Sequence, residues 1–479
     1  MDLAISLDGR GERTARVYRA LRDAVVDGRL PAGHRLPPSR ALAADLGVAR
    51  NSVATAYERL VAEGYLVARV GAGTFVAPRR PASAARAAPP DPLRPRAGWT
   101  FTPMATSADE APPKYDFRVG IPDAGLFPFD TWRRLVAAEL RLRANSPGVY
   151  AGPSGHPALR AAIARYLGYS RSVRATADDV LVTNGTQHAL ELIARVLLRP
   201  GDVVAVEEPG YLPARRLFAS LGARVTGVPV DPDGLRVDAL PAAARLVYAT
   251  PSHQFPLGRA MSMGRRVALL DWARRRQVAV VEDDYDSEFR FSARPLEPLY
   301  ALDTAGRVIY VGTFSKSMLP AVRTGFLLAP PSLRPALVAA RQLGDGYGQV
   351  AVQAALARFI DEGLLARHVR RAAKAYGARY ARISAVLGGH ELLDVLPSAA
   401  GLHVTALLRD GDGDLAARVV QAARREGVVL DDLAVYRHDP VADPAGLAGF
   451  VFGFGAVDPA TLDEGLDRFG ELLRRAATA

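Results

Sequence analysis

Residues 178–314 alternate between short apolar runs and longer segments with helical periodicity. The apolar runs are bounded by Gly, Asp or Pro and include DDVLVTNG, GDVVAVEEPG, RLVYATP, QVAVVEDDYD and RVIYVGTF. Strands of a parallel sheet are buried on both faces and joined by crossover helices, so they have this pattern in sequence. The alternation therefore predicts an α/β domain built on a mainly parallel sheet.

A stretch rich in Pro, Ala and Arg, RRPASAARAAPPDPLRPRAGW at 79–99, separates this region from the N-terminus. It has no apolar period, which is typical of a semi-extended linker. A chain of 479 residues is also too long for a single core. We therefore expect an N-terminal domain at 12–77, a linker at 78–115 and a large domain at 116–479.

The net charge of +11 is concentrated in the N-terminal domain. Residues 1–80 hold 13 arginines against 8 acidic residues, a net of +5 in a sixth of the chain. Such a density of positive charge points this domain toward a polyanion. No secretory signal, membrane-spanning apolar run or cysteine is found in the sequence, so we expect a cytoplasmic protein without disulfides or thiolate metal sites.

The N-terminal domain has helical apolar spacing over 14–28 and over the segment VARNSVATAYERLVAEGY. Between them we expect a short helix with Ser39 as N-cap, ended by Gly47. Two short helices joined by a glycine turn predict a helix-turn-helix. The following YLVARVGAGTFVA predicts a hairpin, or wing, around Gly71 and Gly73.

Polar side chains gather where the second helix of this motif begins. Arginine pairs with guanine and asparagine with adenine in a major groove, while glycine amides approach phosphate closely. The candidate DNA-binding residues are Arg40, Arg50, Asn51, Ser52, Thr55, Gly71 and Gly73. The alternative is a winged helix that binds protein. The run from GRLPAGHRLPPSRALA to GAGTFV resembles the DNA-binding domain of GntR-type bacterial regulators, although Asn51-Ser52 departs from the Ser or Thr pairs usual there.

Lysine is rare in this chain, which has only Lys114, Lys316 and Lys374 among 61 basic residues. An arginine keeps its proton near neutral pH, whereas a lysine amine can become a neutral nucleophile. Lys316 follows an apolar run and lies among hydroxyls, in VGTFSKSMLPAVR. It is either a chance surface residue or a residue kept for its chemistry.

Three further segments, together with Arg323 at the end of the Lys316 run, carry groups that suit a phosphorylated, protonated heterocycle. NGTQ offers amides and a hydroxyl at a helix N-terminus, and Arg323 offers a bidentate grip on phosphate. The run VVEDDYDSEF places acids where a strand ends. These acids could hold a pyridine nitrogen, form a solvated turn or bind a metal, although we expect no His or Cys partner for them nearby. EEPGY provides a ring for stacking.

The order of FRVGIPDAGLFP, YAGPSGHPALR, NGTQ, EEPGY, TPSHQFP, EDDYDSEF and GTFSKSMLPAVRTG resembles fold-type-I aminotransferases that use pyridoxal 5'-phosphate. Joined to a GntR domain, it resembles the MocR/GabR family. The resemblance implies a mainly parallel large domain with a small C-terminal α+β subdomain, a homodimer, and an internal aldimine at Lys316. It also assigns the pyridine nitrogen to Asp283, the ring hydroxyl to Tyr285 and ring contact to Tyr211. It assigns phosphate to Gly185, Thr186, Gln187, Thr313, Ser315 and Arg323, with Tyr150 reaching the partner's phosphate.

Two departures bear on activity. Phe255 stands where many aminotransferases have an Asn that contacts the ring hydroxyl, and Val451 stands where they have an Arg that binds the substrate carboxylate. Arg437 is a candidate substitute for that Arg. The leading hypothesis is a regulator that binds promoter DNA and senses a small amine or the cofactor itself. The alternatives are an active aminotransferase with a fused DNA-binding domain and a binding module with a vestigial pocket.

Overall fold

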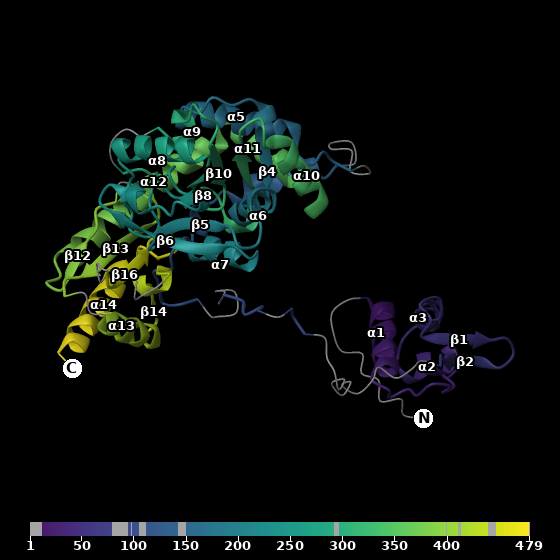
Figure 1. Cartoon of the computed structure of the whole chain (residues 1–479). Helices are drawn as coiled ribbons and strands as arrows, with labels where there is room; N and C mark the ends of the chain where they lie inside the picture. The colour runs from purple at the N-terminus through teal and green to yellow at the C-terminus, as the bar shows by residue number, and fades with distance from the viewer. Residues whose placement is uncertain are drawn as a thin grey trace. The chain divides into compact units, whose positions relative to one another are not determined.

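The computed structural model describes residues 12–78, 94–96, 98–104, 112–141, 150–291, 297–398, 400–410, 413–438 and 447–478. The chain forms two compact units, Met1–Trp99 and Thr100–Ala479 (Figure 1). Most of the predicted linker lies outside the described residues. No helix in the described ranges combines the length and apolar character needed to cross a membrane.

The first unit is a winged helix. Its elements are α1 (Arg13–Val26), α2 (Ser39–Asp45), α3 (Arg50–Ala62), β1 (Leu66–Arg69) and β2 (Gly73–Val76). The helices bury Val17, Leu21, Val53 and Leu60, which recur at helical spacing. The two strands are antiparallel, and Gly71 and Gly73 have positive φ in the turn between them. The prediction of Ser39 as N-cap was wrong: Pro38 holds that position, and Ser39 is the first helical residue.

The second unit contains an eight-stranded sheet in the order β4-β11-β10-β9-β8-β5-β6-β7. Five neighbouring strands, from β10 to β6, are parallel, whereas β11 and β7 run against their neighbours. The strands are β4 (Val180–Thr183), β5 (Val203–Glu208), β6 (Arg224–Asp231), β7 (Gly234–Leu235), β8 (Ala244–Ala249), β9 (Ala279–Asp284), β10 (Val308–Thr313) and β11 (Gly325–Leu328). The predicted mainly parallel sheet is confirmed.

Helices cover both faces of this sheet (Figure 1). Val204 and Val206 of β5 face a cluster with α6, α7 and α10, whereas Ala205 between them faces α8 on the other side. Helices α5 and α11 cover the second face beyond α8. The helices are α4 (Phe129–Glu139), α5 (Pro157–Arg171), α6 (Thr186–Leu197), α7 (Leu212–Ser220), α8 (Met263–Arg276), α9 (Leu299–Leu302), α10 (Arg334–Gly344) and α11 (Val350–Asp361).

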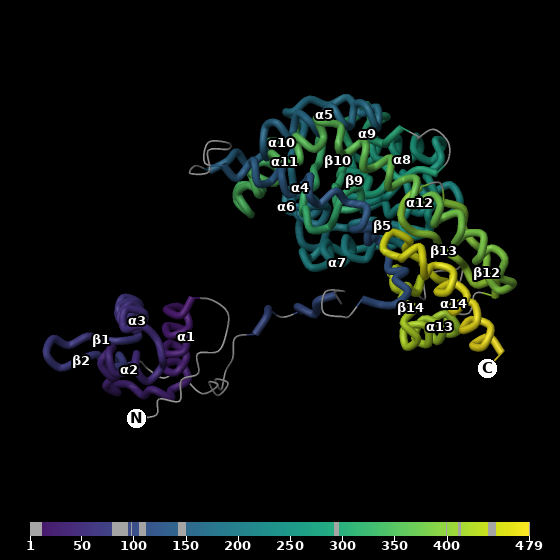
Figure 2. Tube along the Cα trace, turned by 180° about the vertical axis from the view of Figure 1, so that it is seen from behind, coloured from purple at the N-terminus to yellow at the C-terminus, as the bar shows by residue number. Residues whose placement is uncertain are grey.

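A small α+β subdomain follows, packed around a four-stranded antiparallel sheet in the order β12-β13-β16-β15 (Figure 2). Its elements are α12 (Leu364–Gly388), β12 (Leu393–Val395), β13 (His403–Leu408), α13 (Gly413–Arg425), β14 (Val428–Val429), β15 (Asp431–Asp432), β16 (Gly449–Gly453) and α14 (Leu462–Ala477). The earlier strand β3 (Tyr115–Asp116) pairs with β14, so the segment that enters the large domain belongs to this subdomain.

Candidate functional site

A cavity of about 730 Å³ opens where the parallel strands of the large sheet end. Ligands of open α/β sheets bind at this edge because the loops that follow the strands meet there. Nine residues predicted from sequence line the cavity, although they come from segments far apart in the chain. They are Thr186, Gln187, Tyr211, Asp283, Tyr285, Thr313, Ser315, Lys316 and Arg323.

Lys316 lies in the loop after β10, with its amine inside the cavity. Its Nζ donates a hydrogen bond to the carbonyl oxygen of Gly120 at 2.6 Å. Burial lowers the pKa of Lys316, against the opposing effect of Asp286 and Asp283. The surroundings therefore favour the neutral, nucleophilic amine. Gly120 was not predicted as a site residue, although it lies in the quoted motif FRVGIPDAGLFP.

Asp283 is the acid of β9 that faces the cavity. Tyr248 donates a hydrogen bond to its Oδ2 at 2.7 Å, whereas its Oδ1 is buried with no partner among the described residues. Burial raises the pKa of Asp283 to about 7. The buried Oδ1 of Asp283 therefore lacks a hydrogen-bond donor, and a protonated ring nitrogen would be such a donor. Tyr248 was missed because nothing in RLVYATP distinguishes it from a core residue.

The neighbouring acids of the run have structural partners. Glu282 accepts hydrogen bonds from the backbone nitrogens of Leu299 and Tyr300 at the start of α9, both at 2.9 Å. Asp284 contacts Arg171 and Tyr310. The alternation of side chains along a strand sends only Asp283 to the cavity.

The opposite end of the cavity fits a phosphate. Gly185 is the N-cap of α6, and Thr186 and Gln187 form the first turn of that helix. Arg323 lies beside Gly185 and donates a hydrogen bond to the Asn184 carbonyl oxygen at 2.9 Å. The hydroxyls of Thr313 and Ser315 lie 3.0 Å apart. A helix N-terminus, three hydroxyls and a guanidinium make an anion site, so the described residues fit both ends of pyridoxal 5'-phosphate.

Aromatic rings form the cavity wall between these two ends. Tyr211 packs edge-on against Phe255, with ring centroids 5.7 Å apart, and burial raises the pKa of Tyr211 to about 12. The Tyr285 hydroxyl lies 3.0 Å from Nδ1 of His253. Both phenols thus remain protonated and can donate to a ligand.

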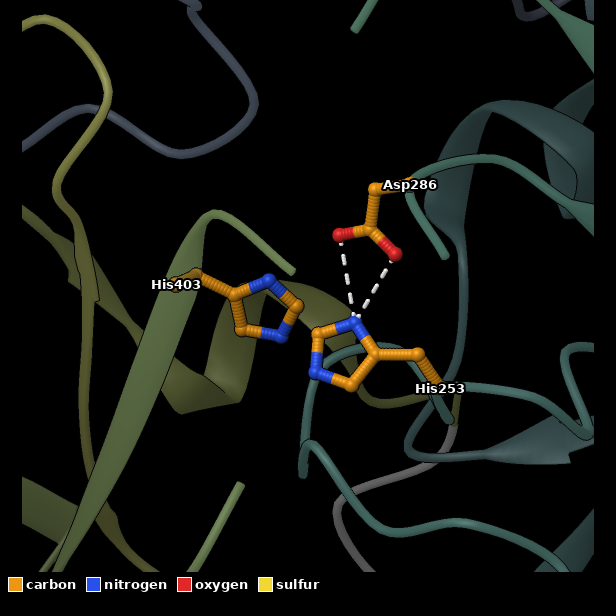
Figure 3. A group of neighbouring side chains, drawn as sticks. All are labelled: His253, Asp286 and His403. Atoms are coloured by element: carbon orange, nitrogen blue, oxygen red, sulfur yellow. Dashed lines mark hydrogen bonds and ion pairs between the residues drawn. The ribbon is translucent and has the colours of Figure 1, made fainter. Parts of the chain in front are cut away.

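His253, Asp286 and His403 form a buried cluster beside Tyr285 (Figure 3). In Figure 3 the two histidine rings lie next to each other, and the Asp286 carboxylate reaches Nδ1 of His253 with both oxygens, at 3.0 and 3.1 Å. The expectation that the acidic run has no histidine partner was therefore wrong. The histidines come from the loop after β8 and from β13, which only the fold brings to Asp286.

The predicted departure at Val451 alters the subdomain side of the cavity. Val451 is fully buried in β16 and packs with Phe255, Leu433 and Tyr436. Its cross-strand partner, Asp431, lines the cavity and accepts a hydrogen bond from the Tyr436 hydroxyl at 2.6 Å. Arg437 is not among the described lining residues, so the structure does not bring this candidate substitute to the cavity wall.

Tyr150 lies outside the cavity of its own chain. Its side chain is 92% exposed, and its ring packs edge-on with that of Tyr347. A residue so exposed in one chain is free to contact a second copy.

The candidate DNA-binding residues lie on the winged helix. Arg50, Asn51 and Thr55 are exposed along the start of α3, and Arg40 is exposed on α2. Within the described residues neither Arg40 nor Arg50 forms an ion pair. Ser52 is half-buried, and Gly71 and Gly73 are exposed at the tip of the wing. Free guanidinium groups at the start of a second helix suit the phosphates and base edges of DNA.

Comparison with known proteins places these two units in one class. Residues 13–76 match the bacterial regulatory proteins of the gntR family, and residues 121–440 match aminotransferase class I and II. The fold is thus a DNA-binding GntR domain joined to a fold-type-I aminotransferase domain. The chain belongs to the MocR/GabR family of transcription regulators.

Three curated relatives share this arrangement. The chain is 38% identical to the probable rhizopine catabolism regulatory protein MocR of Rhizobium meliloti, over 94% of this chain and 92% of that one. It is 34% identical to the pyridoxine biosynthesis regulator PdxR of Corynebacterium glutamicum, over 92% of both chains. It is 33% identical to the regulator TauR of Rhodobacter capsulatus, over 97% of both.

Solved structures match the large unit. Pyrococcus horikoshii kynurenine aminotransferase, in a complex with PMP, gives a TM-score of 0.68 at 29% identity over 75% of this chain and 90% of that one. The α-aminoadipate aminotransferase LysN of Thermus thermophilus gives 0.68 at 27% identity over 76% and 92%.

Proposed function

We propose that this regulator holds pyridoxal 5'-phosphate in the cavity of its large unit and senses a small amine, or the cofactor itself, through a covalent bond to Lys316. One observation carries the proposal. The amine of Lys316, the unpartnered oxygen of Asp283 and the guanidinium of Arg323 line one cavity in a chain that also carries a GntR domain.

When bound, the cofactor supplies an aldehyde for amines and a ring that accepts electrons. The chain's own residues provide the groups that would bind it. Burial favours the neutral amine of Lys316, and the unpartnered oxygen of Asp283 would accept a hydrogen bond from the protonated ring nitrogen. Arg323 and the N-terminus of α6 would hold the phosphate, and the hydroxyl of Tyr285 would donate to the ring oxygen. Exchange of Lys316 for an incoming amine would change the contacts of the cavity wall. The amine can then bind two conformations of the protein with different affinities, as a switch requires.

The proposed assembly is a homodimer. Tyr150 is exposed in its own chain, which supports a contact with the partner's phosphate. Two copies also present two winged helices, and linking two weak contacts raises the affinity for a paired site in a promoter. An isolated 1–80 fragment should then bind the same DNA much more weakly than the whole protein. Binding to promoter DNA supports a cytoplasmic site of action.

The test uses the scarcity of lysine. Purified protein is incubated with pyridoxal 5'-phosphate, reduced with borohydride and digested, and the modified peptide is identified by mass spectrometry. We expect a near-visible absorbance band and a modification at Lys316. Lys316→Ala should abolish both, whereas Lys374→Ala, an exposed residue of α12, should abolish neither. A full band in Lys316→Ala, or labelling of another lysine only, would refute the assignment.

The second candidate function is amino-acid transamination, supported by the intact set around Lys316. Val451 counts against it, because a valine cannot pair with a substrate carboxylate. Repeated turnover of α-amino acids to keto acids would establish this candidate. A single exchange without turnover would support the sensor.

A further inference from the structure

His253 contacts Tyr285 at the point where Phe255 has taken the place of a polar side chain. Nδ1 of His253 lies 3.0 Å from the Tyr285 hydroxyl, and the two rings are stacked with centroids 5.9 Å apart. Phe255 packs edge-on against Tyr285 at 6.0 Å and offers no hydrogen bond. Of these two neighbours, only His253 can orient the phenol by hydrogen bonding.

Asp286 fixes one proton on the His253 ring. The Ser398 hydroxyl lies 2.8 Å from Nε2 of His253 and is also within hydrogen-bond distance, 2.8 Å, of the Ala400 carbonyl oxygen. Nδ1 faces the carboxylate of Asp286, which is an acceptor. Nδ1 of His253 therefore carries a proton, which points toward the carboxylate of Asp286.

This arrangement sets the direction of the next hydrogen bond. The Nδ1 proton is shared between Asp286 and the Tyr285 oxygen, which then accepts. The proton of Tyr285 is left for the cavity. Burial raises the pKa of Tyr285 well above its usual value, so the phenol keeps that proton.

His403, the other histidine of the cluster, has a hydrogen-bond partner of its own. His403 donates from Nε2 to the Pro256 carbonyl oxygen at 2.9 Å, and burial, with the nearby His253, lowers the pKa of His403 well below its usual range. The titratable groups that face Tyr285, His253 or His403 are Asp283, Asp284, Asp286, Glu207, Lys316 and His403.

We propose that His253, held by Asp286 and Ser398, is a positioning residue that directs the Tyr285 proton to the ring oxygen of the bound cofactor, the role that Phe255 cannot fill. The inference rests on the proposed cofactor. A donated hydrogen bond stabilises negative charge on that oxygen. Its loss makes the oxygen hold its shared proton more tightly, which raises the pH at which the near-visible band titrates.

The experiment is a pH titration of that band in the cofactor-loaded, full-length protein. His253→Gln and Tyr285→Phe should each raise the midpoint by about one pH unit, the scale set by one hydrogen bond to a charged group. Because His253 acts through Tyr285, the double variant should titrate like Tyr285→Phe alone. Asp286→Asn should move the midpoint in the same direction, which keeps the test open if His253→Gln fails to fold. His390→Gln, at a partly buried histidine after α12 and outside the cavity lining, should leave the midpoint unchanged.

A wild-type midpoint in both His253→Gln and Asp286→Asn would overturn the proposal. A double variant whose midpoint shift equals the sum of the His253→Gln and Tyr285→Phe shifts would also overturn it. If the wild-type protein binds the cofactor but shows no near-visible band, the proposed covalent bond to Lys316 is refuted. That outcome is separate from unchanged midpoints in a protein that has the band.

Discussion

Nζ of Lys316 lies 2.6 Å from the carbonyl oxygen of Gly120, a residue 196 positions earlier in the chain. Gly120 has a φ of +78°, and a Cβ atom built on it would lie 2.7 Å from Nζ. The backbone ahead of the large sheet thus holds the amine of the loop after β10, at a position where only glycine leaves room.

Gly120→Ala tests this contact. We expect it to destabilise the fold by about 1–2 kcal/mol because of the left-handed backbone. It should also slow formation of the near-visible band on addition of pyridoxal 5'-phosphate, because the added methyl displaces Nζ. Gly264→Ala, in α8 with no atom within 4 Å of the new Cβ, is the control and should show neither effect. Normal band formation in Gly120→Ala would show that this contact does not position Lys316.

A second prediction concerns Asp283 and pH. The pKa of this carboxyl is about 7 in the folded protein against an ordinary value of 3.8. Between these values the folded state keeps a proton that the unfolded state has lost, so the contribution of Asp283 to stability falls as pH rises, until about pH 7. The cofactor-free Asp283→Asn variant does not have this fall in stability. Its free energy of unfolding should therefore rise, relative to that of the wild type, by about 2–3 kcal/mol between pH 5 and pH 7.

Urea unfolding of both proteins at the two pH values measures this difference. In the cofactor-loaded proteins the order should reverse, because a protonated ring nitrogen needs the carboxylate. A stability difference that does not change with pH would mean that Asp283 is ionised throughout.

Sequence patterns predicted those parts of the site that lie in short, ordered motifs. Lys316, Thr313 and Ser315 share one segment, and Asp283 and Tyr285 share another, so chain order alone indicated their association. The sheet was predictable for the same reason, because each parallel strand is a local apolar run.

The parts that were missed depend on long-range packing. His253 meets Asp286 and Ser398 only because β8, β9 and the small subdomain converge, and the separations along the chain are 33 and 145 residues. From the sequence alone Tyr248 has the pattern of a core tyrosine, and its contact with Asp283 follows only from the pairing of β8 with β9. The N-cap of α2 was misplaced because Ser and Pro are adjacent there and both are common where a helix begins.

The third prediction concerns DNA. Arg50→Ala should weaken binding to the protein's own promoter by about 1–3 kcal/mol if Arg50 reads a base, with little change in salt dependence. Arg40→Ala should weaken binding to all sequences and reduce the salt slope by about one, as expected of a phosphate contact. Arg22→Ala, on α1 and paired with Asp23, is the control. Fluorescence anisotropy over a salt series gives both quantities. Unchanged binding in Arg40→Ala and Arg50→Ala would contradict the proposed interface.

The fourth prediction concerns the class of amine. Asp431 lines the cavity opposite the buried Val451, so this wall offers a carboxylate where many aminotransferases offer a guanidinium. Amines without a carboxylate should therefore change the near-visible spectrum at lower concentration than α-amino acids, by about tenfold or more, the equivalent of one charge contact. Asp431→Asn should reduce the preference while keeping the band. Equal responses to ethylamine and alanine in the wild type would contradict it.

The last prediction concerns the end of the linker. Pro103 and Met104 line the cavity, and Arg216, another lining residue, donates a hydrogen bond to the Thr102 carbonyl oxygen at 2.6 Å. The segment that leads from the winged helix is thus part of the cavity wall, and a bound molecule has a direct contact through which to change it. Coupling of this kind is a free-energy difference between the loaded and unloaded states, and it is reciprocal. Arg216→Ala removes the hydrogen bond that holds the segment. We expect the ratio of DNA dissociation constants with and without pyridoxal 5'-phosphate to move toward one, while the absorbance band remains. Arg195→Ala, an exposed residue of α6 paired with Glu191, should keep the wild-type ratio. An Arg216→Ala protein with normal absorbance and an unchanged ratio would show that the signal leaves the cavity by another route.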